Sequence, residues 1–286
     1  MKKVSNINGV LIINKPTGLT SRDVVNNVSK ILNTKKIGHT GTLDPLASGV
    51  LVLTIGKYTK LSEFLMSNFK TYEVKMNLGY LTDTLDTEGN IIEKSNKQVS
   101  NKEIIDTIKS FKKTYEQEVP AYSAIKINGK RLYEYARNNE KIELPKRKVI
   151  IKDIYDINVL GKEITFTCVV SKGTYIRSLV RDIGASLGTY GTMSALNRIK
   201  QGNFDIKKAY TLNDIENGEY KLLTLEDILI DIPKIDMDDT KYKSVFNGAK
   251  QREDCSEEYI AYKYHDDFIA LYKKYGANKY RMYVKF

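Results

Sequence analysis

The first forty residues alternate between a short apolar run and a helical pattern. Residues 9–13 are apolar and end at the turn signal KPTG of residues 15–18, which predicts a short strand. Residues 24–32 then place valine, isoleucine and leucine on one face of a helix. Ser21 lies where a helix-capping side chain is expected. The chain therefore predicts a strand followed by an amphipathic helix.

The middle of the chain continues with strands and helices in irregular order. Residues 36–49 are rich in Gly, Thr and Pro and predict a loop, and residues 50–55 predict a buried strand. Residues 72–78 alternate apolar and polar side chains, as in a half-buried strand. A helix is expected from residue 101, and residues 164–170 form another strand that leads into a helix near Tyr175. Because strict βαβ alternation is missing, the pattern favours the α+β class.

The end of the chain differs from the rest. Residues 225–229 close the first large unit, and the Asp- and Pro-containing residues 231–239 resemble a linker. A small, Tyr-rich β segment follows. A length of 286 residues also favours about two domains. We therefore expect one unit over residues 1–230 and a second over 235–286.

Positive charge is concentrated early in the chain. The formal net charge is +11, and residues 1–75 alone carry 11 Lys+Arg against 4 Asp+Glu, a net of +7. Such an excess is typical of a protein that binds a polyanion, because neutralised phosphates release condensed counterions. A solvated basic face that aids solubility explains the same charge equally well, so charge alone decides nothing.

Several classes of protein are disfavoured. Two cysteines, Cys168 and Cys255, are too few for a disulfide framework, and two histidines do not build a zinc site by themselves. The apolar run near the start is too short for a signal peptide, and no segment approaches the ~18 apolar residues of a membrane span. We expect a soluble, cytoplasmic protein that needs neither metal nor membrane.

One carboxylate lies in an unusually constrained segment, HTGTLDPLASGVL at residues 39–51. Pro45 restricts Asp44 to extended backbone angles, and Gly41 and Gly49 allow other groups to approach closely. The predicted strand that follows would anchor the loop. An acidic side chain on a stiff loop is a common catalytic arrangement, although an isolated Asp-Pro pair usually only opens a turn.

Four segments together resemble the bacterial tRNA pseudouridine-55 synthases, the TruB-type family. They are NKPTGLTS at 14–21, GHTGTLDPLASGVL at 38–51, VPAYSAIKINGKRLYEYAR at 119–137 and SKGTYIRSLVRDIG at 171–184. The resemblance spans about residues 8–230. It implies a catalytic domain with a mixed, largely antiparallel sheet. Residues 235–286 resemble only loosely the small β-rich, PUA-like RNA-binding domain that follows it.

The resemblance implies that a uridine in the T-arm loop of tRNA, U55, becomes pseudouridine without a cofactor. The base is detached from its ribose, rotated and rejoined through carbon. Asp44 would be the essential carboxylate, and three roles stay open for it: attack on the ribose, attack on the uracil ring, or removal of a ribose proton. Arg177 would be its partner, because a cation in the first turn of a helix needs a nearby anion. Tyr72 would stack on the everted base or transfer a proton.

The other site residues implied by the resemblance contact substrate. Tyr175 and Leu196 match positions that line the pocket, and His39 matches a histidine placed against the RNA. For Lys15, contact with a phosphate is mildly preferred over a role in the turn. The chain departs from the family at Asn197, where an arginine is usual. It also has Val170, where cysteine is common.

Two alternatives share part of this pattern. A non-catalytic protein that binds or folds tRNA on the same scaffold would keep the basic residues and would not need Asp44. The catalytic subunit of a guide-RNA-dependent machine would share the Asp44 loop, but such subunits usually carry extra terminal segments. Nothing in the sequence demands a dimer, and we expect a monomer.

Overall fold

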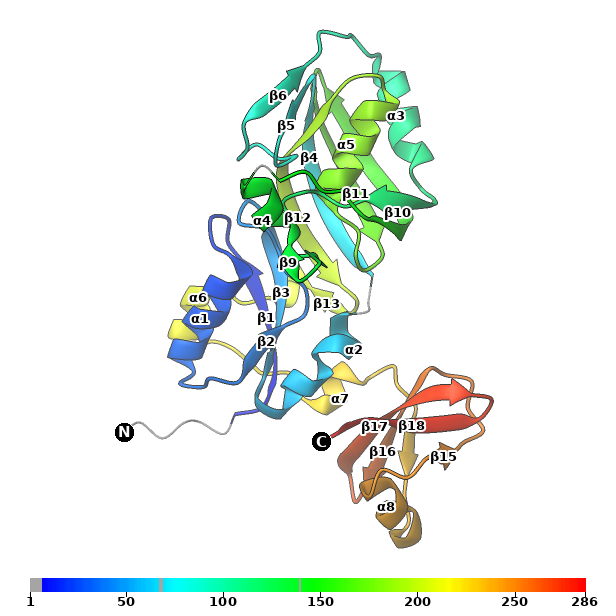
Figure 1. Ribbon diagram of the computed structural model, residues 1–286. Helices are drawn as coiled ribbons and strands as arrows, with labels where there is room; N and C mark the ends of the chain where they lie inside the picture. Colours follow the sequence, from blue (N-terminus) through cyan, green and yellow to red (C-terminus); the bar gives the residue numbers. More distant parts are fainter. Residues whose placement is uncertain (1–6, 67–68, 139) are drawn as a thin grey trace.

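The computed structural model describes residues 7–66, 69–138 and 140–286, which form two large sheets (Figure 1). The larger sheet has nine strands, seven of them in the order β1-β3-β12-β4-β11-β10-β7, with β2 added to β3 and β13 to β12. These strands are β1 (Gly9–Lys15), β2 (Ile37–His39), β3 (Ser48–Ile55), β4 (Lys70–Leu78), β7 (Thr114–Glu118), β10 (Lys146–Leu160), β11 (Glu163–Val170), β12 (Gly191–Gln201) and β13 (Phe204–Asp205).

Pairing in the large sheet is antiparallel with one exception. β3 and β12 run parallel, and all the other pairs are antiparallel. Helices and strands follow one another without βαβ alternation. The α+β class with a mixed, largely antiparallel sheet is confirmed.

Helices and short hairpins surround this sheet. The helices are α1 (Ser21–Ile31), α2 (Ser62–Met66), α3 (Asn101–Ser110), α4 (Leu132–Arg137), α5 (Ile176–Ser186), α6 (Leu212–Glu216) and α7 (Leu225–Ile228), with 3-10 turns η1 (Gly56–Leu61) and η2 (Ile206–Lys208). Two separate hairpins are β5 (Tyr80–Thr82) with β6 (Ile91–Lys94), and β8 (Lys126–Ile127) with β9 (Lys130–Arg131). None of the helices in the described ranges is both long and apolar enough to cross a membrane.

Strand β3 is buried on both faces, which explains its continuous apolar run. Leu51 and Leu53 belong to a cluster under α1 and α6, whereas Val50 and Val52 belong to a second cluster on the other face. That second cluster includes Ala261 from the smaller sheet. The two sheets therefore share an apolar contact.

Strand β4 shows the expected alternation. Tyr72, Val74 and Met76 lie in the main core together with residues of α3 and α5, while Glu73 is exposed on the opposite face. One face of this half of the sheet is therefore covered by helices, as Figure 1 shows for α3 and α5. The alternation in the sequence identified the covered face correctly.

The smaller sheet has five strands in the order β14-β16-β17-β18-β15. Its elements are β14 (Lys234–Asp236), α8 (Asp239–Phe246), β15 (Gln251–Arg252), β16 (Tyr259–Tyr264), β17 (Asp267–Gly276) and β18 (Lys279–Lys285). The tyrosines Tyr262, Tyr272 and Tyr280 are buried in its core.

The linker expected over residues 231–239 is wrong in part, because β14 pairs there with β16. The division into units 1–230 and 235–286 stays a prediction, and residues 1–6 lie outside the described residues.

Two local expectations are corrected. The loop expected over residues 36–49 contains strand β2, which pairs with β3. The cap of α1 is Thr20 and not Ser21: the Thr20 hydroxyl accepts from the Asp23 backbone, and the Asp23 carboxylate accepts from the Thr20 backbone in return. The reason is that Ser21 is buried and bonds elsewhere, to the backbone of Leu43.

Helix α5 is pressed against the start of β12 at a glycine. A Cβ on Gly184 would lie 2.3 Å from the backbone nitrogen of Gly191. We predict that Gly184→Ala destabilises the protein by about 1–3 kcal/mol through overpacking, although alanine is the better helix former. Ser186→Ala, at an exposed position of the same helix, is the matched control. Urea unfolding of both variants checks this, and equal stability of the two would contradict the close packing.

Candidate active site

Asp44 lies in the loop between β2 and β3, and hydrogen bonds to Gly18 and Ser21 hold this loop in place. The Ser21 hydroxyl donates to the Leu43 carbonyl at 3.0 Å and accepts from the Leu43 amide at 2.8 Å. The Gly18 amide donates to the Pro45 carbonyl at 2.8 Å. The residues on either side of Asp44 are therefore tied to Gly18 and to Ser21, the first residue of α1. Its own side chain is 37% exposed.

The guanidinium of Arg177 holds that carboxylate. Its Nε lies 3.0 Å from Asp44 Oδ2, and its Nη1 lies 3.6 Å from Asp86 Oδ2. The remaining donors reach the carbonyls of Thr84 at 2.9 Å and Tyr122 at 3.1 Å. Arg177 is buried, so each of these contacts replaces water. The predicted pairing of Arg177 with Asp44 is present.

Helix α5 brings this arginine to the site. Arg177 lies in its first turn, where the helix dipole disfavours a cation and favours an anion. Two carboxylates beside the guanidinium offset that effect. Arg177 is itself buried, and its helix neighbours Ile176 and Leu179 belong to the main apolar core, which anchors the start of α5.

Asp86 was missed by the sequence analysis. It is 4% exposed, and its Oδ1 accepts from the Thr84 hydroxyl at 2.6 Å and from the Glu88 amide at 3.1 Å. The turn that carries it holds Leu85 at a φ of +66°, which is a strained conformation for leucine. An acidic, Thr-rich turn with no motif gives no signal in the sequence that its aspartate is buried against an arginine.

A cavity of about 700 Å³ opens over Asp44. Of the seven predicted site residues, five line it and two do not. The five are Asp44, Tyr72, Tyr175, Arg177 and Leu196. Its wall also includes the three arginines Arg22, Arg131 and Arg137. The site therefore combines one partly exposed carboxylate, aromatic and apolar surfaces, and a cationic rim.

Tyr72 is fixed by a buried arginine that the sequence analysis did not assign to the site. Arg198 is 1% exposed, and its Nη1 donates to the Tyr72 hydroxyl at 3.5 Å. Its Nε donates to the Val50 carbonyl at 2.6 Å and its Nη2 to the Gly41 carbonyl at 3.0 Å. Arg198 thus joins the tyrosine to the loop that carries the carboxylate.

Tyr175 occupies the position just before α5. Its amide donates to Gln117 Oε1 at 2.8 Å, and burial raises the pKa of its phenol above the ordinary value. The phenol therefore stays protonated at neutral pH, and Tyr175 is one of the residues that line the cavity.

Lys15 is buried and turned toward the backbone of neighbouring segments. Its side chain is fully buried, and its ammonium donates to the carbonyls of Pro16, Leu19 and Pro45. Burial lowers the pKa of Lys15 to about 8, although the nearby Asp44 carboxylate opposes that shift. In this structure the lysine anchors the loop of Asp44, because its donors reach three carbonyls, and the contact with a phosphate stays a prediction.

His39 lies on β2, outside the residues that line the cavity. It is half-buried, and burial, together with Arg22 and Arg198, lowers the pKa of its imidazole. Its Nδ1 has no hydrogen-bond partner among the described residues. The predicted contact between His39 and RNA stays a prediction. Within the described ranges, no group of three or more His, Cys, Asp or Glu side chains is arranged to hold a metal ion.

Comparisons with known proteins identify the family. The family model described as "TruB family pseudouridylate synthase (N terminal domain)" matches residues 29–176, which is more than half of the chain. The description "tRNA pseudouridylate synthase B C-terminal domain" matches residues 177–231. The chain belongs to the TruB family. The second match begins in α5 and includes β12, so it falls on the large sheet and ends before the smaller one.

Curated relatives extend over nearly the whole chain. The "tRNA pseudouridine synthase B" of Caldicellulosiruptor saccharolyticus is 43% identical over 269 residues, covering 94% of this chain and 92% of that protein. The protein of the same name from Staphylococcus aureus (strain MSSA476) is 46% identical over 258 residues, covering 85% of each. The TruB-type motifs therefore lie in a chain that is similar from end to end.

Solved structures confirm the fold. A chain in the structure of a Cbf5-Nop10-Gar1 complex has a TM-score of 0.71 and 28% identity, covering 94% of this chain and 79% of that chain. A chain in an H/ACA RNP bound to a substrate RNA containing 2'-deoxyuridine has a TM-score of 0.71 and 25% identity, covering 97% and 84%.

The burial of Asp86 beside Arg177 leads to a prediction about the stability of this TruB-family chain. Asp86→Asn keeps the shape of the side chain but leaves the buried Arg177 with one charged partner instead of two. We predict a loss of about 1.5–3 kcal/mol in the free energy of unfolding, as for hydrogen bonds to charged groups. The control is Asp106→Asn at an exposed position of α3, which should change stability by less than about 0.5 kcal/mol. Chemical denaturation distinguishes them, and a loss no larger than the control's would show that Asp86 is not part of the buried network.

Proposed function

We propose that this protein converts U55 in the T-arm loop of tRNA to pseudouridine and that Asp44 is the catalytic carboxylate. One observation carries the proposal: Asp44, 3.0 Å from the buried Arg177, faces a cavity that also presents Tyr72 and Leu196. Membership of the TruB family supports the reaction, and the names of the curated relatives support tRNA as the substrate.

The carboxylate is suited to this chemistry. A carboxylate paired with a guanidinium needs no general base to act as a nucleophile. The buried guanidinium orients it by a charge-assisted hydrogen bond, while 37% of the side chain stays exposed toward substrate. Attack on the ribose, attack on the uracil ring and removal of a ribose proton all fit this position. Each is redox-neutral and uses no cofactor.

The cavity also suits an everted base. Removing a base from its stack requires a few kcal/mol, and stacking on an aromatic side chain returns about 1–3 kcal/mol. Tyr72 supplies the aromatic face and Leu196 an apolar one. The arginines Arg22, Arg131 and Arg137 at the cavity wall suit phosphates on either side of the flipped nucleotide.

Three further features belong to the same proposal: the oligomeric state, the role of the smaller sheet and the location in the cell. We propose that the protein acts as a monomer. We also propose the smaller sheet as the PUA-like, RNA-binding unit, and the cytoplasm as the location of the reaction, because tRNA is the proposed substrate. A non-catalytic tRNA-folding role on this scaffold gives no reason for a buried arginine beside the exposed carboxylate of Asp44, so the enzyme is favoured.

The first test removes the charge of Asp44. Asp44→Asn should lower pseudouridine formation on unmodified tRNA by at least about 10³-fold, because the group that attacks substrate or accepts its proton is lost. Binding of tRNA should persist. Mass spectrometry after site mapping measures the product, and Asp106→Asn should retain wild-type activity. Pseudouridine formed by the Asp44→Asn variant at the wild-type rate would exclude the catalytic role.

The second test concerns the cationic rim. If the arginines contact phosphates, log K for tRNA should fall steeply and linearly with log[salt]. Replacing one of them, as in Arg131→Gln, should reduce the magnitude of that slope by about 1. Fluorescence anisotropy over a salt series measures both quantities, and a flat dependence for the wild type would contradict a phosphate-binding rim.

A further inference from the structure

The candidate active site spans a short contact between β3 and β12 in the large sheet, which we call the joint. The loop of Asp44 leads directly into β3, whereas Tyr72 lies on β4 and Leu196 on β12. β3 and β12 are joined by only two residue pairs, Asn197 with Ser48 and Arg198 with Gly49. The strands on either side of this joint pair over seven or more positions. The placement of Asp44 relative to Tyr72 therefore depends on a short contact.

The two strands approach closely at this joint. A Cβ on Gly49 would lie 2.3 Å from the Arg198 carbonyl oxygen and 2.5 Å from Asn197 Oδ1. Gly49 also has a φ of +101°, in the region that favours glycine. Any shift of β12 is thus transmitted directly to the first residues of β3, a few positions after Asp44.

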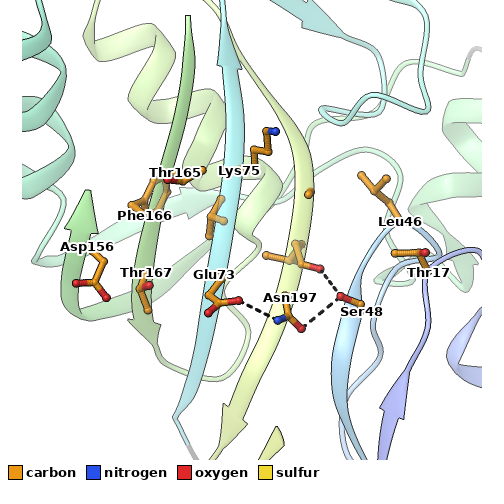
Figure 2. Close-up of a pocket in the computed structure, with 13 residues that line it drawn as sticks. Thr17, Leu46, Ser48, Glu73, Lys75, Asp156, Thr165, Phe166, Thr167 and Asn197 are labelled. Atoms are coloured by element: carbon orange, nitrogen blue, oxygen red, sulfur yellow. Dashed lines mark hydrogen bonds between the residues drawn. The ribbon is translucent and has the colours of Figure 1, made fainter. Parts of the chain in front are cut away.

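Side chains bridge the joint on both faces of the sheet. On the cavity face, Arg198 binds the loop and Tyr72, as described above. On the opposite face, Asn197 Nδ2 donates to Glu73 Oε2 at 2.9 Å, and the Ser48 hydroxyl donates to Asn197 Oδ1 at 3.3 Å. Figure 2 shows this Glu73–Asn197–Ser48 bridge running across β4, β12 and β3. The Ser48 hydroxyl also reaches the Leu196 carbonyl at 3.5 Å.

The bridge residues are neighbours in sequence of the cavity residues. Glu73 follows Tyr72, and Asn197 lies between Leu196 and Arg198. Successive side chains of a strand point to opposite faces, so the bridge lies on the face opposite Tyr72 and Arg198, where it lines a groove of about 460 Å³. Leu196 lines both this groove and the cavity. Because none of the three bridge residues lines the cavity, we expect the bridge to act through the backbone of β4, β12 and β3.

We propose that Glu73, Asn197 and Ser48 are positioning residues that set the distance between Asp44 and the base-stacking surfaces of Tyr72 and Leu196. This inference rests on the proposed function and adds a determinant of its rate. Asn197 is the centre of the bridge, because its amide is donor to one strand and acceptor from the other. Misplacement of reacting groups by about 1 Å can lower a rate by about 10²-fold.

A pair of substitutions tests the bridge without changing its size. Asn197→Asp removes the donor and places a second carboxylate against Glu73. It should lower the single-turnover rate constant for pseudouridine formation by about 10–100-fold, with an unchanged Kd for tRNA. Glu73→Gln retains an acceptor for Asn197 and should react like the wild type. The double variant, Glu73→Gln with Asn197→Asp, restores a donor–acceptor pair and should recover most of the rate.

The control lies on the same face of the same strand. Lys75 forms an ion pair with Glu163 at 2.8 Å, away from the joint, so Lys75→Gln should leave the rate unchanged. All rates are measured at a temperature where circular dichroism shows every variant folded. A wild-type rate for Asn197→Asp, or a double variant as slow as Asn197→Asp, would overturn the positioning role. Absence of pseudouridine with the wild-type protein would instead overturn the proposed function.

Discussion

The buried guanidinium of Arg177 is the interaction on which the rest of the site depends. A desolvated cation is stable only if anions and carbonyls replace its water. Asp44, Asp86 and the carbonyls of Thr84 and Tyr122 do so, and they come from separate segments of the chain. Because the buried guanidinium of Arg177 needs these partners, the loop after β2, the turn after β5 and the segment before β8 all meet at the start of α5.

Asp44 differs from the other partners in being partly exposed. Asp86 is buried, and its carboxylate is shared between Arg177 and its own turn, whereas the side chain of Asp44 is 37% exposed. Beneath it, Ser21 and Lys15 hold the backbone of its loop, and Arg198 ties that loop to Tyr72. A carboxylate held this way pays little reorganisation when substrate arrives, which is the preorganisation that catalysis by a fixed charge requires.

Much of this could be predicted from local sequence and motif. The alternation of residues 72–78 identified the buried face of β4, and the family motifs predicted the pairing of Asp44 with Arg177 that the ion pair shows. What failed depends on long-range contacts. The strand β2 forms because β3 offers an edge, Ser21 and Lys15 turn inward to the loop of Asp44, and Asp86 is buried only because Arg177 arrives from a distant helix. No pattern in a single segment contains that information.

In the proposed complex, Asp44 faces the sugar–base junction of an everted uridine bound between Tyr72 and Leu196. A crystal structure of the Asp44→Asn variant with an unmodified T-arm stem-loop tests this arrangement. We expect the target base inside the cavity, stacked on Tyr72, with its ribose C1′ and uracil ring beside the side chain at position 44. A complex in which the target base stays stacked in the loop, or enters another surface of the protein, would contradict it.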